Sequence, residues 1–365
     1  MRMNPEQVID IYRMSRAAQH RYQLEQFERG VLVNMRNTVE RSRRQIIADL
    51  SGKIQYARTA AHQTAILGEL DELSLGLRRA LGEQLTSATA AVGSASLQEA
   101  YNTLSLGGIA PMVNNVSLSP AQYRQFLGSN PIGGLLLPQW VDAAYNHSIV
   151  GPLKEQLNIG ALRGSSYDNI VGGLAGMFDN FSRRELTTLT RTYFQEANVR
   201  SHQAVMEANR DVVEGGIWTT VSDGRCCIEC LPLSENFYKM DEEHPPIPAH
   251  PNCRCMPRTK TVSFRDLGMD IDELAPIEQA VVTRGYLDEK DRWVIPPVGT
   301  GGGAPVREIR FYLGGLKEAF PDMPREQQIA MIGPKRYELL QQGKITLDDL
   351  VDRKTGRVRL LNELK

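Results

Sequence analysis

Residues 225–233 read RCCIECLPL and residues 248–255 read PAHPNCRC, and these two stretches hold the most informative residues of the chain. All five cysteines lie within residues 226–255. In each stretch two potential ligands are separated by two residues, a spacing at which a tight turn can aim both side chains at one tetrahedral zinc ion. The candidate ligands are Cys227, Cys230, His250, Cys253 and Cys255.

The sequence leaves the ligand set open, because Cys255 can replace Cys253 or His250 in a set of four. A zinc site also competes with two simpler interpretations of the same residues. They are buried cysteines beside a surface histidine, and a disulfide between Cys227 and Cys230. The clustering of the cysteines in a protein expected in a reducing cytosol favours the metal. Four protein ligands leave no coordination position for water, so we expect the zinc to be structural.

The residues before the cysteines predict a short piece of β-structure. Ile217 to Val221 read IWTTV, which has a strong strand preference, and Asp223-Gly224 is a turn signal. In an extended backbone the side chain of Cys226 points away from that of Cys227, so Cys226 is left out of the ligand set. We therefore expect a small β-type module, stabilised by zinc, over residues 217–257.

The N-terminal part predicts long helices. Asn4-Pro5 is a helix start, and apolar residues recur on one helical face from Val8 to Leu50. A second helical pattern extends from Ile54 to about Leu104. A long helix is stabilised mainly by burying its apolar stripe. Two alternatives stay open for the first stripe: a partner protein covers it, or the second helical segment does.

The remaining sequence predicts shorter elements. Helices are expected over residues 139–153 and 166–177, and a long helix is expected to follow a capping box at Ser182-Glu185. Two more are expected in the tail, over residues 307–320 and 325–342. The stretch WVIPPVGTGGGAP, residues 293–305, predicts a flexible linker before a separate tail. We expect a mainly α-helical α+β protein. Its divisions are a helical N-terminal arm (1–106), a linker (107–134), a domain with the zinc knuckle (135–262), an irregular connector (263–305) and a helical tail (306–365).

Composition and missing motifs exclude several functions. The net charge of −1 gives no global attraction to nucleic acid, and no run approaches the ~20 apolar residues of a membrane span. The first residues lead into an amphipathic helix instead of an apolar signal core, so we expect synthesis in the cytoplasm. Motifs of zinc proteases, zinc deaminases, serine hydrolases, P-loop proteins and dinucleotide-binding proteins do not occur, and we expect no enzyme.

The stretch WTTVSDGRCCIECLPL, residues 218–233, together with PAHPNCRC resembles the phage Mu F-like head morphogenesis family. The family pattern has a tryptophan, an aspartate, an arginine, a C-x-x-C pair and a final H-P-x-C-R-C. The matching residues are Trp218, Asp223, Arg225, Cys227, Cys230, His250, Cys253, Arg254 and Cys255. Cys226 departs from the pattern, which usually has an apolar residue there. The resemblance covers about residues 135 to 260, and part of residues 329–365.

The resemblance implies a structural minor head protein of a tailed phage, present in low copy number and acting in head morphogenesis. It places such a protein in the virion, at the portal vertex of the phage head. The implied partner is the portal protein. The major capsid protein, other copies of the chain and the phage DNA, with which the protein can leave the head, are further candidates.

Two other functions compete with this one. A nucleic-acid-binding zinc module would use the small basic strip Arg254, Arg258 and Lys260, which has no interleaved aromatic residues. A zinc-dependent hydrolase or a toxin-type transferase would need a nucleophile, a base and a charge stabiliser, and none is evident after the knuckle. Asp223 and Arg225 are treated as scaffolding, because a turn aspartate paired with an arginine is the commoner arrangement.

Overall fold

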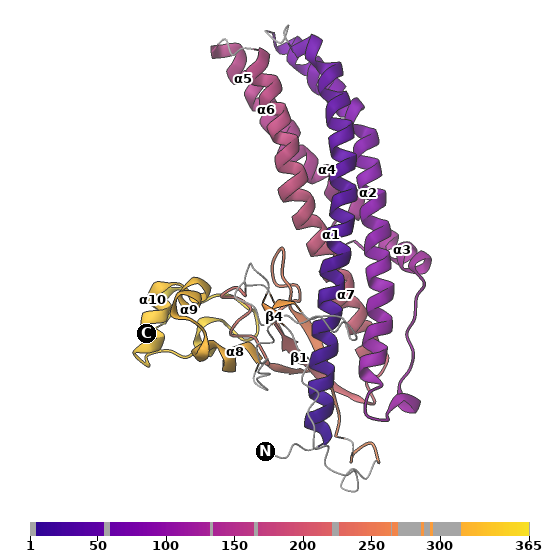
Figure 1. The fold of residues 1–365 in the computed structure, drawn as a ribbon, viewed down its shortest axis with the longest axis vertical. Coiled ribbons are helices and arrows are strands. Elements are labelled where there is room, and N and C mark those ends of the chain that lie inside the picture. The colour runs from indigo at the N-terminus through magenta and orange to yellow at the C-terminus, as the bar shows by residue number, and fades with distance from the viewer. Residues whose placement is uncertain are drawn as a thin grey trace. The chain divides into compact units, whose positions relative to one another are not determined.

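The computed structural model describes residues 5–54, 59–131, 134–163, 167–220, 226–263, 265–268, 286–287, 293–294 and 315–364. The helices are α1 (Pro5–Ile54), α2 (Ala60–Leu104), α3 (Pro120–Ser129), α4 (Leu137–Tyr145), α5 (Gly151–Arg163), α6 (Tyr167–Asn180), α7 (Leu186–Glu207), α8 (Gly315–Ala319), α9 (Arg325–Ile332) and α10 (Pro334–Gln341). The strands are β1 (Val213–Thr219), β2 (Phe237–Lys239), β3 (Met256–Thr261), β4 (Tyr286–Leu287) and β5 (Trp293–Val294). The prediction of a mainly α-helical α+β protein is confirmed (Figure 1).

The chain forms two compact units, and each combines segments that are distant in sequence. Unit 1 contains Met1–Gln23, Ala95–Ser117 and Asn198–Lys365. Unit 2 contains Leu24–Ser94 and Leu118–Ala197. The sheet and the cysteines therefore belong to unit 1. Among the described residues, no helix is both long enough and apolar enough to cross a membrane.

Unit 2 is built on the paired helices α1 and α2. The helix α1 begins at Pro5, as predicted, and its apolar stripe is buried within unit 2. The buried stripe residues there are Leu24, Leu32, Met35, Val39, Ile46 and Leu50. Thr38 accepts a hydrogen bond from Gln84 of α2 at 3.1 Å, and Lys53 forms an ion pair with Glu69. In unit 2 the chain thus covers this stripe itself, as in the second of the two alternatives.

A predicted helix start and a predicted linker differ from the structure. Ser182 does not cap a helix, because Phe181–Glu185 is a π-helical turn that continues α6 directly into α7. The helical run stays unbroken there because Phe178 and Phe181 are both buried against Tyr145, with ring centroids 6.2 and 5.7 Å away. The expected linker at residues 107–134 contains α3. A capping box of Ser119 and Gln122 starts this helix, and the four residues Ser119 to Gln122 are a local sequence signal for a helix start.

The sheet of unit 1 has the strand order β2-β1-β3, and both pairings are antiparallel. The predicted strand exists, but it starts at Val213, four residues before the expected Ile217. Gly215 lies on β1 where a Cβ atom would come within 2.1 Å of the backbone oxygen of Tyr238. Only glycine therefore allows β2 to pair this closely with β1.

The tail folds onto residues 226–236, which lie in the connection between β1 and β2 and which we call the cysteine loop. The prediction of a separate tail is therefore wrong. The expected helix over residues 325–342 is divided into α9 and α10 by Gly333, whose φ of 84° lies in the left-handed region. Leu231 packs into one apolar cluster with the tail residues Leu316, Phe320, Met331, Ile332, Ile345, Leu350 and Leu364. Within the predicted linker, Trp293–Val294 pairs as β5 with β4, and residues 295–305 lie outside the described part of the chain.

Candidate metal centre

The structure brings all five predicted ligands together in unit 1. Cys227 and Cys230 lie in the turns that follow β1, whereas His250, Cys253 and Cys255 lie directly before β3. The Sγ atom of Cys227 is 3.1 Å from Nε2 of His250, and the Sγ atom of Cys230 is 3.4 Å from it. The Sγ atoms of Cys230 and Cys253 are 3.9 Å apart. All five cysteines of the chain lack disulfide bonds.

These donor atoms form two overlapping groups of three. Cys227, Cys230 and His250 make the first group, and Cys230, Cys253 and Cys255 make the second, with every distance inside a group within 4.8 Å. Tetrahedral zinc, with Zn–S of about 2.3 Å and Zn–N of about 2.0–2.1 Å, separates neighbouring donor atoms by about 3.5–3.8 Å. The donor separations therefore fit a metal ion of this size, and the cluster can hold one.

Local backbone geometry aims the ligands. The backbone N–H of Leu231 donates to the oxygen of Cys227 at 3.0 Å, which closes the turn between the first two cysteines. The N–H of Cys253 donates to the oxygen of His250 at 3.0 Å in the same way, and Asn252 completes that turn with a φ of 61°. Asparagine tolerates this left-handed conformation better than most residues. The spacing of two residues in each pair is therefore what a closed turn requires.

The imidazole of His250 is oriented for binding through Nε2. Its Nδ1 atom lies 2.9 Å from the carbonyl oxygen of Pro251, so the ring can donate a proton there while Nε2 faces the cysteines. A second hydrogen bond of this kind fixes the tautomer and the ring direction of most metal-binding histidines.

The five side chains also shift one another's protonation. The pKa of Cys227 is lowered to about 4, first by the hydrogen bond from Cys230 and then by its contact with His250. The pKa of His250 is raised to about 9, chiefly by its hydrogen bond with Cys227. Hydrogen bonds from Cys230 and Cys255 lower the pKa of Cys253. The pKa of Cys230 is instead raised, first by its hydrogen bond with Cys227, and the pKa of Cys255 is raised as well. The contacts within the cluster therefore favour the thiolate, the form of cysteine that binds metal, at Cys227 and Cys253.

The cluster is embedded in an apolar layer. Cys230, Cys253 and Cys255 are buried, and Cys227 and His250 are half-buried. The buried residues that pack together around them are Trp218, Cys230, Leu233, Tyr238, Cys253, Cys255 and Val351. Neither group of potential ligands includes an aspartate or glutamate among the described residues. A site made only of thiols and an imidazole suits zinc and other thiophilic ions.

The remaining residues of the family pattern differ in their position and burial. Trp218 is buried on β1 beside the cysteines, with 1% of its surface exposed. Asp223 and Arg225 lie outside the described residues. Arg254, between two candidate ligands, is half-buried. Cys226 packs partly against both apolar clusters, and its Sγ atom donates to the oxygen of Cys227 at 3.6 Å.

The basic strip expected for nucleic-acid binding does not form. Arg258 is buried and makes ion pairs with Asp10 at 2.6 Å and with Glu235 at 2.5 Å. Lys260 pairs with Glu214 at 2.9 Å, and its Nζ atom lies 4.4 Å above the ring of Phe237. The sequence contains no local signal for these partners, because Asp10 precedes Arg258 by 248 positions.

Comparison of the chain with known proteins yields no match. No protein-family profile, no curated protein and no solved structure is similar to it at a significant level.

Proposed function

We propose that the protein is a structural minor head protein of a tailed phage, present in few copies at the portal vertex and acting in head assembly. The observation that carries the proposal is the convergence of the motif residues. Trp218 of β1, the C-x-x-C pair and the H-P-x-C-R-C segment meet in one buried cluster. This is the arrangement expected if the resemblance in sequence reflects a shared module. The partner we propose is the portal protein, with the capsid protein, a second copy or phage DNA as further contacts.

We also propose that the bound ion is zinc and that its role is structural. Four of the five candidate residues would complete a tetrahedron of thiolates and one imidazole, and such a closed set leaves no position for substrate or water. The burial of three of the cysteines supports this role. A small module with few strands gains from such an ion, because zinc binding can supply ~10 kcal/mol or more towards folding. A zinc-dependent hydrolase or transferase would need an open position, so we propose no enzymatic activity.

The function is tested in the phage that encodes the chain. Particles are purified by density gradient, and the protein is quantified by mass spectrometry against the major capsid protein. We expect it in heads at a few copies per particle, and cross-linking should join it to the portal protein. Its absence from both immature and mature heads would refute the proposal.

The nucleic-acid-binding alternative loses support from the ion pairs described above. Arg258 is buried and doubly paired, and Lys260 is paired with a neighbouring glutamate, so neither presents a free cation to a phosphate backbone. Phosphate contacts by such residues dominate the affinity of proteins for nucleic acids. Contact with packaged DNA would therefore have to use another surface.

A further inference from the structure

Two consecutive residues of the cysteine loop face different apolar clusters. Cys230 belongs to the cluster that contains Trp218 and the other buried cysteines. Leu231, which is fully buried, belongs to the cluster formed with the tail. A candidate metal ligand is therefore covalently joined to a residue that fills the core of the tail. Any movement of one must displace the other.

The apolar core of the tail is small without Leu231. Residues 315–364 supply seven buried apolar side chains to the shared cluster, and the described tail contains only short helices. Segments of about 50 residues seldom bury enough apolar surface to fold without a metal, a disulfide or a partner surface. The tail therefore depends on the cysteine loop as its packing surface.

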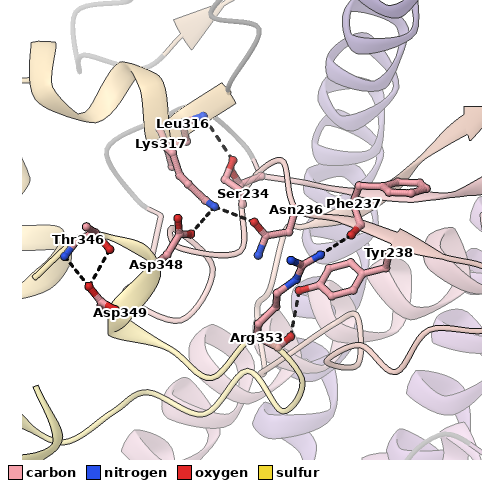
Figure 2. Close-up of polar contacts among 11 residues, drawn as sticks. Ser234, Asn236, Phe237, Tyr238, Leu316, Lys317, Thr346, Asp348, Asp349 and Arg353 are labelled. Carbon is pink, nitrogen blue, oxygen red and sulfur yellow. Dashed lines mark hydrogen bonds and ion pairs between the residues drawn. The ribbon is translucent and has the colours of Figure 1, made fainter.

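Polar contacts attach the start of the tail to the same loop (Figure 2). The backbone N–H of Leu316 donates to Oγ of Ser234 at 3.3 Å. The Nζ atom of Lys317 donates to Asn236 at 2.7 Å and to Asp348 at 2.6 Å. Ser234 and Asn236 follow the second cysteine ligand by four and six positions. The helix α8 is thus fixed to the part of the loop that the metal would order.

A second set of contacts attaches the end of the tail to β2. The guanidinium group of Arg353 donates to the oxygen of Phe237 at 2.8 Å and lies 5.3 Å from the ring centre of Tyr238. In return the hydroxyl of Tyr238 donates to the backbone oxygen of Arg353 at 3.1 Å, as Figure 2 shows. Gly356, with a φ of 71°, passes so close to Pro245 that a Cβ atom would approach it within 2.9 Å.

We propose that the metal centre holds the C-terminal segment in place, so that loss of the metal releases residues 315–364 from the body of unit 1. This inference rests on the proposed zinc site. Without the ion, the turns at Cys227–Cys230 and His250–Cys253 are held by backbone hydrogen bonds, by apolar contacts and by the weak contacts of the thiols with one another and with His250. The loop then opens, Leu231 leaves the tail core, and the apolar face of the tail becomes accessible. We call the site a metal-dependent latch, because bound metal keeps residues 315–364 packed and loss of the metal releases them.

The test is hydrogen exchange measured by mass spectrometry on the full-length protein, with its zinc content determined in the same samples. Removing zinc with a chelator should speed exchange in residues 316–350 at least tenfold, and restoring zinc should reverse the change. Amides in the middle of α2, in unit 2, provide an internal control and should not change. Unchanged protection of the tail after confirmed loss of zinc would overturn the latch and leave the zinc proposal standing. Protein that never contains metal would overturn both.

A pair of leucine substitutions tests the path of the coupling. Leu231→Ala keeps all five candidate ligands but removes the side chain that joins the two clusters. It should retain zinc and still expose the tail, with exchange at least tenfold faster than in the wild type. Leu360→Ala is the matched control, because this tail leucine is 58% exposed, and it should leave exchange unchanged. Full protection of the tail in Leu231→Ala would refute the path through Leu231.

Discussion

Asp10 in the first turns of α1 and Arg258 on β3 form an ion pair of 2.6 Å across 248 positions of sequence. Glu235, in the cysteine loop, binds the same guanidinium group at 2.5 Å. Arg13 lies next to this pair, and burial lowers its pKa to about 10. Burial also raises the pKa of Glu235. The N-terminal turns of α1 are therefore part of the packing of unit 1.

Replacing Arg258 with alanine should destabilise unit 1 by about 3–5 kcal/mol, because it leaves two carboxylates without their buried partner. Lys260→Ala is the matched control on the same strand, since this lysine is 45% exposed and its pair with Glu214 contributes about 0–1 kcal/mol. Denaturant unfolding followed by circular dichroism measures both. Equal effects of the two substitutions would contradict the importance assigned to the buried pair.

The same two variants examine the nucleic-acid-binding alternative. The affinity for double-stranded DNA of random sequence is measured by fluorescence anisotropy over a range of salt concentrations. Each lost phosphate contact reduces the slope of log K against log salt by about 0.9. We expect no change of slope in either variant, because both cations are paired within the protein. A reduction of about one unit in Lys260→Ala would restore the alternative.

The candidate site was predictable because its information is local. Two ligands separated by two residues require only a closed turn, and the structure has such a turn at each pair. The start of α1 at Pro5 and the strand β1 were predicted for the same reason. The sequence does not predict which four of the five candidate residues bind the ion, because this depends on where the turns place Cys255 relative to His250.

Long-range packing explains most of the differences between the structure and the predictions from the sequence. The apolar contacts of Phe178 and Phe181 with Tyr145 hold a π-helical turn where the capping motif at Ser182 predicted a helix start. The sequence predicts a separate tail because no residue near Leu231 indicates that the Leu231 side chain fills the apolar core of the tail. In contrast, Gly333-Pro334 is a local break signal, and it separates α9 from α10 within the predicted tail helix.

The burial of the α1 stripe predicts a large difference between two nearby positions. Met35 is fully buried in unit 2, whereas Val33 is 54% exposed. Met35→Ala should lower the free energy of unfolding by about 2–5 kcal/mol, because it removes buried apolar atoms and leaves a cavity. Val33→Ala should change it by at most about 0.5 kcal/mol. A thermal unfolding experiment on both variants measures the difference, and equal, small effects of the two substitutions would contradict the role assigned to the buried stripe in the stability of unit 2.

The metal centre predicts one zinc ion per chain in freshly purified protein, measured by elemental analysis. Cys227→Ser and Cys230→Ser should each lose the ion, because both belong to the groups that converge on the site. Cys226→Ser is the control and should retain it, since the thiol of Cys226 donates to a backbone oxygen.

The choice of the fourth ligand follows from the same measurement on Cys253→Ser and Cys255→Ser. Only the variant that removes a ligand should lose zinc, so the two substitutions assign the set that the geometry leaves open. Loss of zinc from Cys226→Ser would show that Cys226, and not its neighbour Cys227, binds the ion. A wild-type protein without stoichiometric metal would refute the site.

A buried histidine pair makes the stability of unit 1 depend on pH. Nε2 of His20 on α1 lies 3.1 Å from Ser96 of α2 and 3.1 Å from Asn198 of α7. The ring centroids of His20 and His202 are 6.3 Å apart, and both histidines are 5% exposed. Burial, followed by the nearby His20, lowers the pKa of His202 from 6.5 to about 3.

Charged groups also surround this pair. Glu99 of α2 faces His20, and it is held in an ion pair with Arg16 of α1 at 2.6 Å. Arg21 lies near His20 as well. Burial remains the largest effect, and it lowers the pKa of His20 too. Both rings are therefore neutral in the folded protein at neutral pH.

The direction of the pH effect follows from these shifts. The unfolded chain binds a proton at each histidine below pH 6.5, and the folded chain binds it only near pH 3 in the case of His202. The contribution to stability is therefore complete above pH 6.5 and is lost as the pH falls from there towards 3. For His202 alone, the loss between pH 7.5 and pH 5 is about 2 kcal/mol, at about 1.4 kcal/mol per pH unit.

This dependence is measured by denaturant unfolding at several pH values between 7.5 and 5, in the wild type and in His202→Gln. The difference between the two curves isolates the histidine from the other titrating groups, including the metal ligands. The variant should lose about 2 kcal/mol less than the wild type over this range, whatever its stability at pH 7.5. His147→Gln, at an exposed position, should follow the wild-type curve. If His202→Gln keeps the full wild-type dependence, the buried pair does not control the acid stability of unit 1.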